Sequence, residues 1–126
     1  MYDIRGLVGS EMTFEGVKAI GAAFVDELSL AGASLVVGHD MRDSSVEFVE
    51  AFIEGANARG ADAINLGLCS TDECYFASGY LDAAAAMFTA SHNPASYNGI
   101  KLSRAGARGI SMDTGLSAIL ERAQKY

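Results

Sequence analysis

The chain has 126 residues, half of them hydrophobic, and this length can bury one core but not comfortably two. Sixteen acidic and nine basic residues give a net charge of -7, which repels nucleic-acid backbones and anionic membranes at long range. No apolar run approaches the ~18 residues that a membrane-spanning helix needs, and the segment 1–5 does not form a signal peptide. We therefore expect one cytoplasmic domain that binds neither nucleic acid nor a membrane.

The first part of the chain combines a helical pattern with a strand pattern. Thr13 is a suitable N-cap, and apolar residues recur at three- and four-residue steps over 14–28. This spacing predicts an amphipathic helix that Gly32 stops. The short apolar segment 34–37 predicts a strand, and the turn around 38–40 leads out of it.

The rest of the chain continues this alternation. We predict next a helix that Gly60 stops, with Val49, Phe52, Ile53 and Ala56 on one face. After it we predict a strand over 63–66, a short helix over 73–81 and a strand over 84–88. A last helix should begin at about Asp113. Because helices separate the strands, right-handed crossovers should produce a mainly parallel sheet covered on both faces. The sequence thus predicts the α/β class, as a three-layer αβα sandwich with a mainly parallel, mixed sheet in a single domain.

The segment Thr89-Ala90-Ser91-His92-Asn93-Pro94 places a hydroxyl and an imidazole beside two turn-forming residues. It follows an apolar strand, so we expect Ser91 at the exit of that strand. Asn98-Gly99 predicts a second turn, which would bring Lys101 into the same loop as Ser91 and His92. Ligands of such sheets collect beyond the carboxyl ends of the strands.

Cations favour a phosphate as the ligand at this end. Free serine is a poor nucleophile, whereas a phosphoserine carries roughly -1.5 to -2 charges that nearby cations can offset. The turn at 38–45 should end at the same edge of the sheet as the Ser91 segment, which would bring Arg42 near Ser91. The basic residues expected in loops are Arg5, Arg42, Lys101, Arg104 and Arg108.

Two other functions stay open from the residues alone. A serine hydrolase would need a base, but Ser91 lacks a Gly-x-Ser-x-Gly elbow and His39 is the only histidine not adjacent to it. A phosphate-binding or regulatory module would keep the cations without turnover. Cys69 and Cys74 are too few for a disulfide scaffold and form no zinc pattern with the histidines, so we expect reduced thiols.

Three ordered motifs resemble those of the α-D-phosphohexomutases, the family of phosphomannomutase, phosphoglucomutase and phosphoglucosamine mutase. They are Tyr2-Asp3-Ile4-Arg5-Gly6, Gly38-His39-Asp40-Met41-Arg42-Asp43-Ser44-Ser45 and the Ser91 hexapeptide. The resemblance implies that Ser91 is phosphorylated and donates its phosphoryl group, with His92, Lys101 and Arg5 around it. Tyr2, Arg42 and Asn93 would help to bind phosphate, although each can also have a purely structural role.

The resemblance also implies a reaction, the reversible movement of phosphate between positions 1 and 6 of mannose or glucose through a bisphosphorylated sugar. Mg²⁺ would be held by a phosphoryl oxygen on Ser91 and by an Asp-Gly-Asp-Gly-Asp-Arg segment that this chain lacks, and hexose 1,6-bisphosphate would be the activator. We therefore expect domain I of a four-domain enzyme, over residues 1–126, clipped before Tyr2, inactive alone and normally packed against the missing domains. The chain departs from the family pattern at His39, often arginine, and at Ser70-Thr71-Asp72-Glu73, often a Thr-Pro turn.

Overall fold

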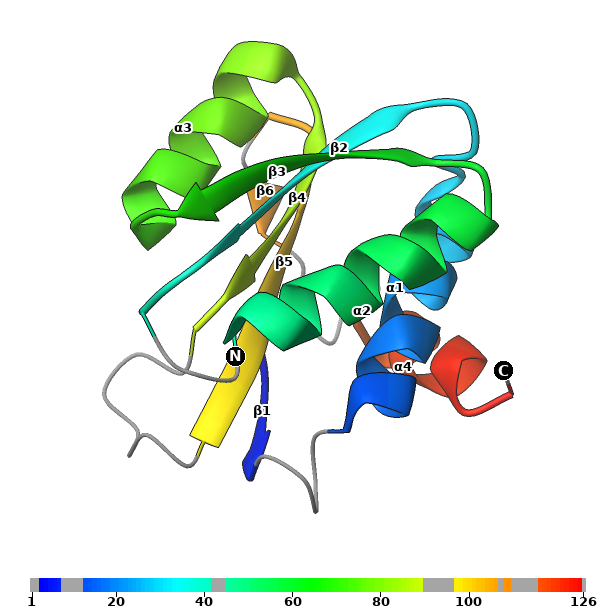
Figure 1. Cartoon of the computed structure of the whole chain (residues 1–126). Coiled ribbons are helices and arrows are strands. Elements are labelled where there is room, and N and C mark those ends of the chain that lie inside the picture. The colour runs from blue at the N-terminus through cyan, green and yellow to red at the C-terminus, as the bar shows by residue number, and fades with distance from the viewer. Residues whose placement is uncertain are drawn as a thin grey trace.

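Helices and strands alternate along most of the chain (Figure 1). The computed structural model describes residues 3–7, 13–41, 45–89, 97–106, 108–109 and 116–125. In chain order the elements are β1 (Asp3–Leu7), α1 (Phe14–Leu28), β2 (Ser34–His39), α2 (Ser45–Ala58), β3 (Asp62–Leu68), α3 (Thr71–Leu81), β4 (Ala84–Phe88), β5 (Tyr97–Arg104), β6 (Arg108–Gly109) and α4 (Leu116–Ala123).

The strands form one mixed sheet in the order β1-β5-β4-β2-β3, with β6 pairing with β5. Strand β2 runs parallel to β3 and to β4, and these are the strands that the sequence places between helices. Strand β5 is the next described element after β4 and runs antiparallel to β4, β1 and β6. The predicted α/β class with a mixed sheet is confirmed.

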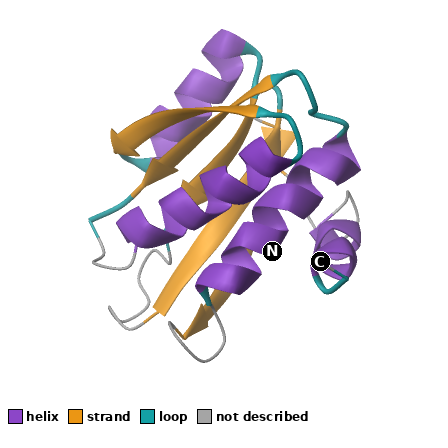
Figure 2. Cartoon of the chain, turned by 45° about the vertical axis from the view of Figure 1, so that its right-hand side comes forward, coloured by secondary structure: helices purple, strands orange, loops and turns teal. Residues whose placement is uncertain are grey.

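The side chains of the central strands alternate between two apolar layers. On β2, Leu35 and Val37 belong to the core cluster that includes residues of α1, α2 and α4, while Val36 packs in a second cluster with Cys74 of α3. Strand β4 alternates in the same way, and all its residues are buried. Helices α1, α2 and α4 therefore cover one face of the sheet and α3 covers the other (Figure 2), which confirms the three layers.

Aromatic rings join the layers at the centre of the core. Phe52 of α2 has no exposed surface, and its ring centroid lies 5.9 Å from that of Phe24 on α1 and 5.6 Å from that of Phe88 on β4. Ring pairs at such distances add to the free energy of burying their apolar surface. Phe88 is the last residue of β4, so this packing holds the end of that strand against α2.

The termini of two helices show how local sequence sets their bounds. The Thr13 hydroxyl accepts a hydrogen bond from Gly16 N at 3.0 Å, which confirms the predicted N-cap of α1. The helix ends at Ser29, whose φ of 56° is left-handed, and Gly32 adopts its own positive φ in the turn that follows. Helix α3 begins at Thr71, before the predicted 73, because Ser70 and Glu73 form a capping box.

Two predictions about the segment after β4 are wrong. Asn98 and Gly99 do not form a turn but lie within β5, where Gly99 pairs with Arg5 of β1. Lys101 is also a strand residue and does not share a loop with Ser91. The same correction applies to the other cations expected in described loops, since Arg5, Arg104 and Arg108 lie in β1, β5 and β6.

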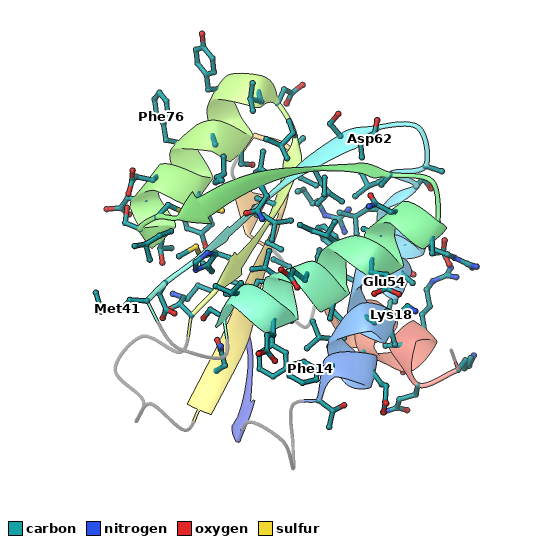
Figure 3. All side chains as sticks on the ribbon, in the orientation of Figure 1. Phe14, Lys18, Met41, Glu54, Asp62 and Phe76 are labelled. Atoms are coloured by element: carbon teal, nitrogen blue, oxygen red, sulfur yellow. The ribbon has the colours of Figure 1, made fainter. Side chains whose placement is uncertain are left out.

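Charged pairs connect the helices on their exposed side. Lys18 of α1 binds Glu54 of α2 at 2.9 Å, and Figure 3 shows the two side chains close together between the helices. Arg59 binds Asp26 through two nitrogen atoms, and Arg122 of α4 binds Glu27 of α1 at 2.7 Å. Such exposed pairs each contribute about 0–1 kcal/mol to the free energy of folding, so the buried apolar layers dominate stability.

None of the helices in the described ranges has the length and apolar character to cross a membrane.

Candidate functional site

The parallel strands β2 and β4 end side by side at one edge of the sheet. Their last residues, His39 and Phe88, are partners in the register. Just beyond them, Asp40 N donates a hydrogen bond to the Phe88 carbonyl oxygen at 3.0 Å. The segments that carry the second and third sequence motifs therefore leave the sheet at the same edge, as the topology predicted.

The structure describes only part of the predicted site. The backbone of Arg5 lies in β1, and Lys101 is described together with its side chain. The other predicted site residues lie outside the described residues; they are Tyr2, Arg42, Ser91, His92 and Asn93. The predicted gathering of cations around Ser91 stays a prediction.

The two described positions, 5 and 101, are brought onto neighbouring strands. Lys101 pairs with Asp3 on β1 and with Met87 on β4, while Arg5 pairs with Gly99. Positions 5 and 101 are thus diagonal neighbours in the antiparallel ladder, the arrangement in which long side chains reach one another. Lys101 is half-buried and shares the α3 face of the sheet with its partner Met87.

A chain of hydrogen bonds connects three segments at this edge. The Ser45 hydroxyl, at the start of α2, donates to Asp40 Oδ1 at 2.9 Å. Asn98 Nδ2, near the start of β5, donates to Ser45 Oγ at 3.1 Å, and Asn98 Oδ1 accepts from Gly99 N at 2.8 Å. We call Asp40, Ser45 and Asn98 the polar bridge. Sequence reasoning missed it because Asn98 read as a turn former, and only the burial of Ser45 and Asn98 reveals the contact.

His39 has a local structural contact at the end of β2. Its Nδ1 lies 2.7 Å from the Asp40 carbonyl oxygen, and since a carbonyl can only accept, this nitrogen carries the proton and donates. The ring is half-buried. His39 therefore supports the turn that the family resemblance associates with phosphate, at the position where that pattern often has arginine.

An apolar cavity lies beside α3, at the side of the sheet formed by β3. It has a volume of about 570 Å³ and opens between the end of β3 and α3. Among the described residues that line it there are two carboxylates and no cation, so these residues do not suit a phosphate. The lining residues include Leu66, Leu68, Cys69, Asp72, Glu73 and Phe76.

The described side chains that could ligate a metal ion do not gather into a metal site. Nowhere in the described ranges do three or more His, Cys, Asp or Glu side chains gather so that they could hold a metal ion. Asp40 instead accepts the Ser45 hydroxyl, and His39 donates to the backbone. The described residues by themselves therefore do not form a metal site.

Known proteins resemble the chain over nearly its whole length. A family model described as phosphoglucomutase/phosphomannomutase, alpha/beta/alpha domain I, matches residues 1–126. A protein of Xanthomonas campestris pv. campestris named phosphohexose mutases is 47% identical over 119 residues, which cover 94% of this chain and 26% of that protein. Vibrio cholerae phosphomannomutase is 41% identical over 128 residues, covering 98% of this chain and 28% of that protein.

The fold of the chain also matches a solved structure. A phosphoglucomutase/phosphomannomutase family protein from Burkholderia thailandensis aligns with a TM-score of 0.81 at 32% identity. The alignment covers 98% of this chain and 29% of that chain. The chain thus spans about a quarter of the length of these relatives.

Proposed function

Since this chain belongs to the phosphoglucomutase/phosphomannomutase family, as its α/β/α domain I, we propose that it supplies the phosphoserine of a mutase for hexose phosphates. Ser91 holds the phosphoryl group between its two transfers. One observation carries this proposal: the motif segments after β2 and β4 leave adjacent strands at one edge of the sheet. Ser91 follows Thr89, the last described residue of that exit, by two positions.

Two cations are proposed to stabilise the charge of the transferring group. Lys101 and Arg5 occupy diagonal positions on β5 and β1. Strand β5 pairs with β4 on one side and with β1 on the other. A phosphoserine bears roughly -1.5 to -2 charges, and the chain as a whole is acidic, so local positive charge is needed to hold the phosphate. His92, Tyr2, Arg42 and Asn93 are proposed to complete the binding of phosphate.

The proposed reaction consists of two transfers in opposite directions. A sugar hydroxyl oxygen attacks the phosphorus of phosphoserine 91, the bond from phosphorus to Ser91 Oγ breaks, and Lys101 or His92 relays the proton of the sugar hydroxyl to Ser91 Oγ. The bisphosphorylated sugar then reverses its orientation. Ser91 Oγ attacks the other phosphorus, the bond from that phosphorus to the sugar oxygen breaks, and Lys101 or His92 relays the proton of the Ser91 hydroxyl to that sugar oxygen. Ser91 is then phosphorylated again, so atoms and charge balance over the cycle.

The cofactors and the place of action are proposals from the family resemblance. Mg²⁺ would spread the charge of the transferring group, with ligands from a phosphoryl oxygen on Ser91 and from outside this chain. Hexose 1,6-bisphosphate would restore the phosphoserine when it is lost. Mannose phosphate and glucose phosphate are both proposed substrates, and a cytoplasmic location stays a prediction.

The test is the intact mass of the full-length enzyme that contains this domain. We expect the wild type to carry one phosphoryl group after incubation with hexose 1,6-bisphosphate, and the Ser91→Ala variant to carry none and to lose turnover. Ser103→Ala is the matched control, because Ser103 is a buried serine of β5 that pairs with Ala85, away from the strand exit. A wild-type enzyme that never carries phosphate, or an active Ser91→Ala enzyme, contradicts the proposal. The alternative function, a phosphate-binding regulatory module, would give a protein that binds phosphate but shows no turnover.

A further inference from the structure

The polar bridge connects the turn after β2 with the start of β5, the strand that follows the segment containing Ser91. Asp40 directly follows β2, Ser45 begins α2 and Asn98 is the second residue of β5. Backbone hydrogen bonds reinforce this junction, since Asp40 N donates to Phe88 O at 3.0 Å and Thr89 N donates to Gly99 O at 2.9 Å. The strand exit before Ser91 and the strand entry after it are thereby tied to the same turn.

Burial makes the geometry of the bridge specific. Ser45 and Asn98 have no exposed surface, and a buried polar group without a partner is unfavourable. The Ser45 hydroxyl has one proton, which it donates to Asp40, so its oxygen accepts from Asn98 and the two bonds define one arrangement. An apolar contact would bury the same surface without this directionality.

From this placement we propose that Ser45 and Asn98 are positioning residues that hold the two strand ends around the Ser91 segment in register for phosphoryl transfer. The inference rests on the proposed function of Ser91. Phosphoryl transfer depends almost entirely on position and electrostatics, and a displacement of about 1 Å can lower the rate by about 10²-fold. The bridge acts on transfer through the backbone and does not touch the substrate.

The experiment uses the full-length enzyme with variants at both ends of the bridge. Ser45→Ala removes the central hydroxyl, and Asn98→Leu removes the bond to Ser45 while keeping a side chain of similar size, so that it leaves no large cavity. We expect each to lower kcat by about 10- to 100-fold with KM for the hexose phosphate changed less than threefold. Because both act on one bridge, the double variant should lose no more than about the larger single loss.

Two controls separate positioning from general loss of stability. Ser103→Ala removes another buried hydroxyl, one for which the described part of the chain offers no hydrogen-bond partner, and it should retain wild-type kcat. Ser45→Thr restores a hydroxyl and should recover most of the kcat lost in Ser45→Ala. Thermal unfolding of each variant confirms that the assay temperature lies below its transition.

The outcomes distinguish this inference from the function on which it rests. A folded Asn98→Leu or Ser45→Ala enzyme with wild-type kcat overturns the positioning role, even when its unfolding temperature falls. If the kcat losses of the two single variants add in the double variant, the claim that Ser45 and Asn98 act through one bridge is wrong. A wild-type enzyme without a phosphoserine instead defeats the proposed function, which the mass measurement detects independently of the variants.

Discussion

Burial determines the chemistry of the Cys74 thiol. Cys74 lies on α3 with no exposed surface and packs with Val36 and Met87 against the sheet. Burial raises the pKa of this thiol from 9.0 to about 12, with a smaller contribution from Cys69, while a backbone hydrogen bond from Gly38 lowers it. Both cysteines are free, as the sequence predicted, and the pKa of Cys69 is also raised, mainly by burial.

This raised pKa predicts a loss of stability in alkaline solution. Below about pH 9 the Cys74 thiol is protonated in both the folded and the unfolded chain, so it has no pH effect there. Between about pH 9 and 12 only the unfolded chain releases the proton, so the free energy of unfolding falls by up to about 1.4 kcal/mol per pH unit. Urea unfolding of this chain as a function of pH measures the slope.

The Cys74→Ala variant isolates the contribution of this thiol. Tyrosines and lysines titrate in the same range, but they do so in both proteins, so the difference between the two curves reports Cys74. We expect the curves to be parallel up to about pH 9 and to converge above it. Curves that stay parallel up to pH 12 would show that the thiol ionises in the folded protein as easily as in the unfolded one.

At the scale of elements, glycines allow α1 and α2 to approach closely. A Cβ atom added to Gly21 of α1 would collide with the backbone of Phe52, and one added to Gly55 of α2 would collide with the backbone of Lys18. Each collision is with the main chain of the facing helix, which cannot turn aside as a long side chain can. The two helices can keep this packing only with glycine at both positions.

This close approach predicts that replacing glycine by alanine has opposite effects on stability in α2 and in α3. Gly55→Ala should destabilise the protein by about 1–3 kcal/mol, because the steric conflict outweighs the better helix propensity of alanine. Gly79→Ala is the matched control: Gly79 lies in α3, is exposed and has nothing within 4 Å of an added Cβ. It should stabilise by up to about 1 kcal/mol. Chemical denaturation of both variants checks the sign, and equal stabilities would contradict the helix contact.

At the scale of the whole molecule, three described cations on helices or directly after one form ion pairs between elements. Lys18, Arg59 and Arg122 all pair with carboxylates that connect α1 with its neighbours. The proposed chemistry therefore depends on the cations of the sheet and motif segments. The metal segment of the family pattern is not in this sequence, and the chain spans about a quarter of its relatives.

We accordingly expect the 126-residue chain by itself to fold without turning over hexose phosphates. Its buried layers are formed by its own helices and strands, whereas metal ligands and sugar contacts are proposed to come from outside this chain. Circular dichroism measures folding, and a coupled assay with Mg²⁺ and hexose 1,6-bisphosphate measures turnover. The full-length enzyme is the positive control. Turnover by the isolated chain above the level of its Ser91→Ala variant would contradict this expectation.

The sequence by itself determined the features that depend on neighbouring residues. The period of apolar residues predicted α1 and α2, Thr13 predicted a helix start, and the uniform apolar run predicted β4. These signals are local because helix and strand periodicity, capping and turns involve residues within a few positions of one another. The α/β class followed from their order.

Only the tertiary structure decided the remaining features, because they depend on partners far apart in the chain. Asn98 has a turn-forming side chain, yet it lies in a strand that pairs with β1, and its amide donates to Ser45, 53 positions earlier in the chain. Lys101 likewise becomes a strand residue through pairing with β4 and β1. The contact of Gly55 with the Lys18 backbone has no sequence signal, since the missing side chain matters only once the two helices meet.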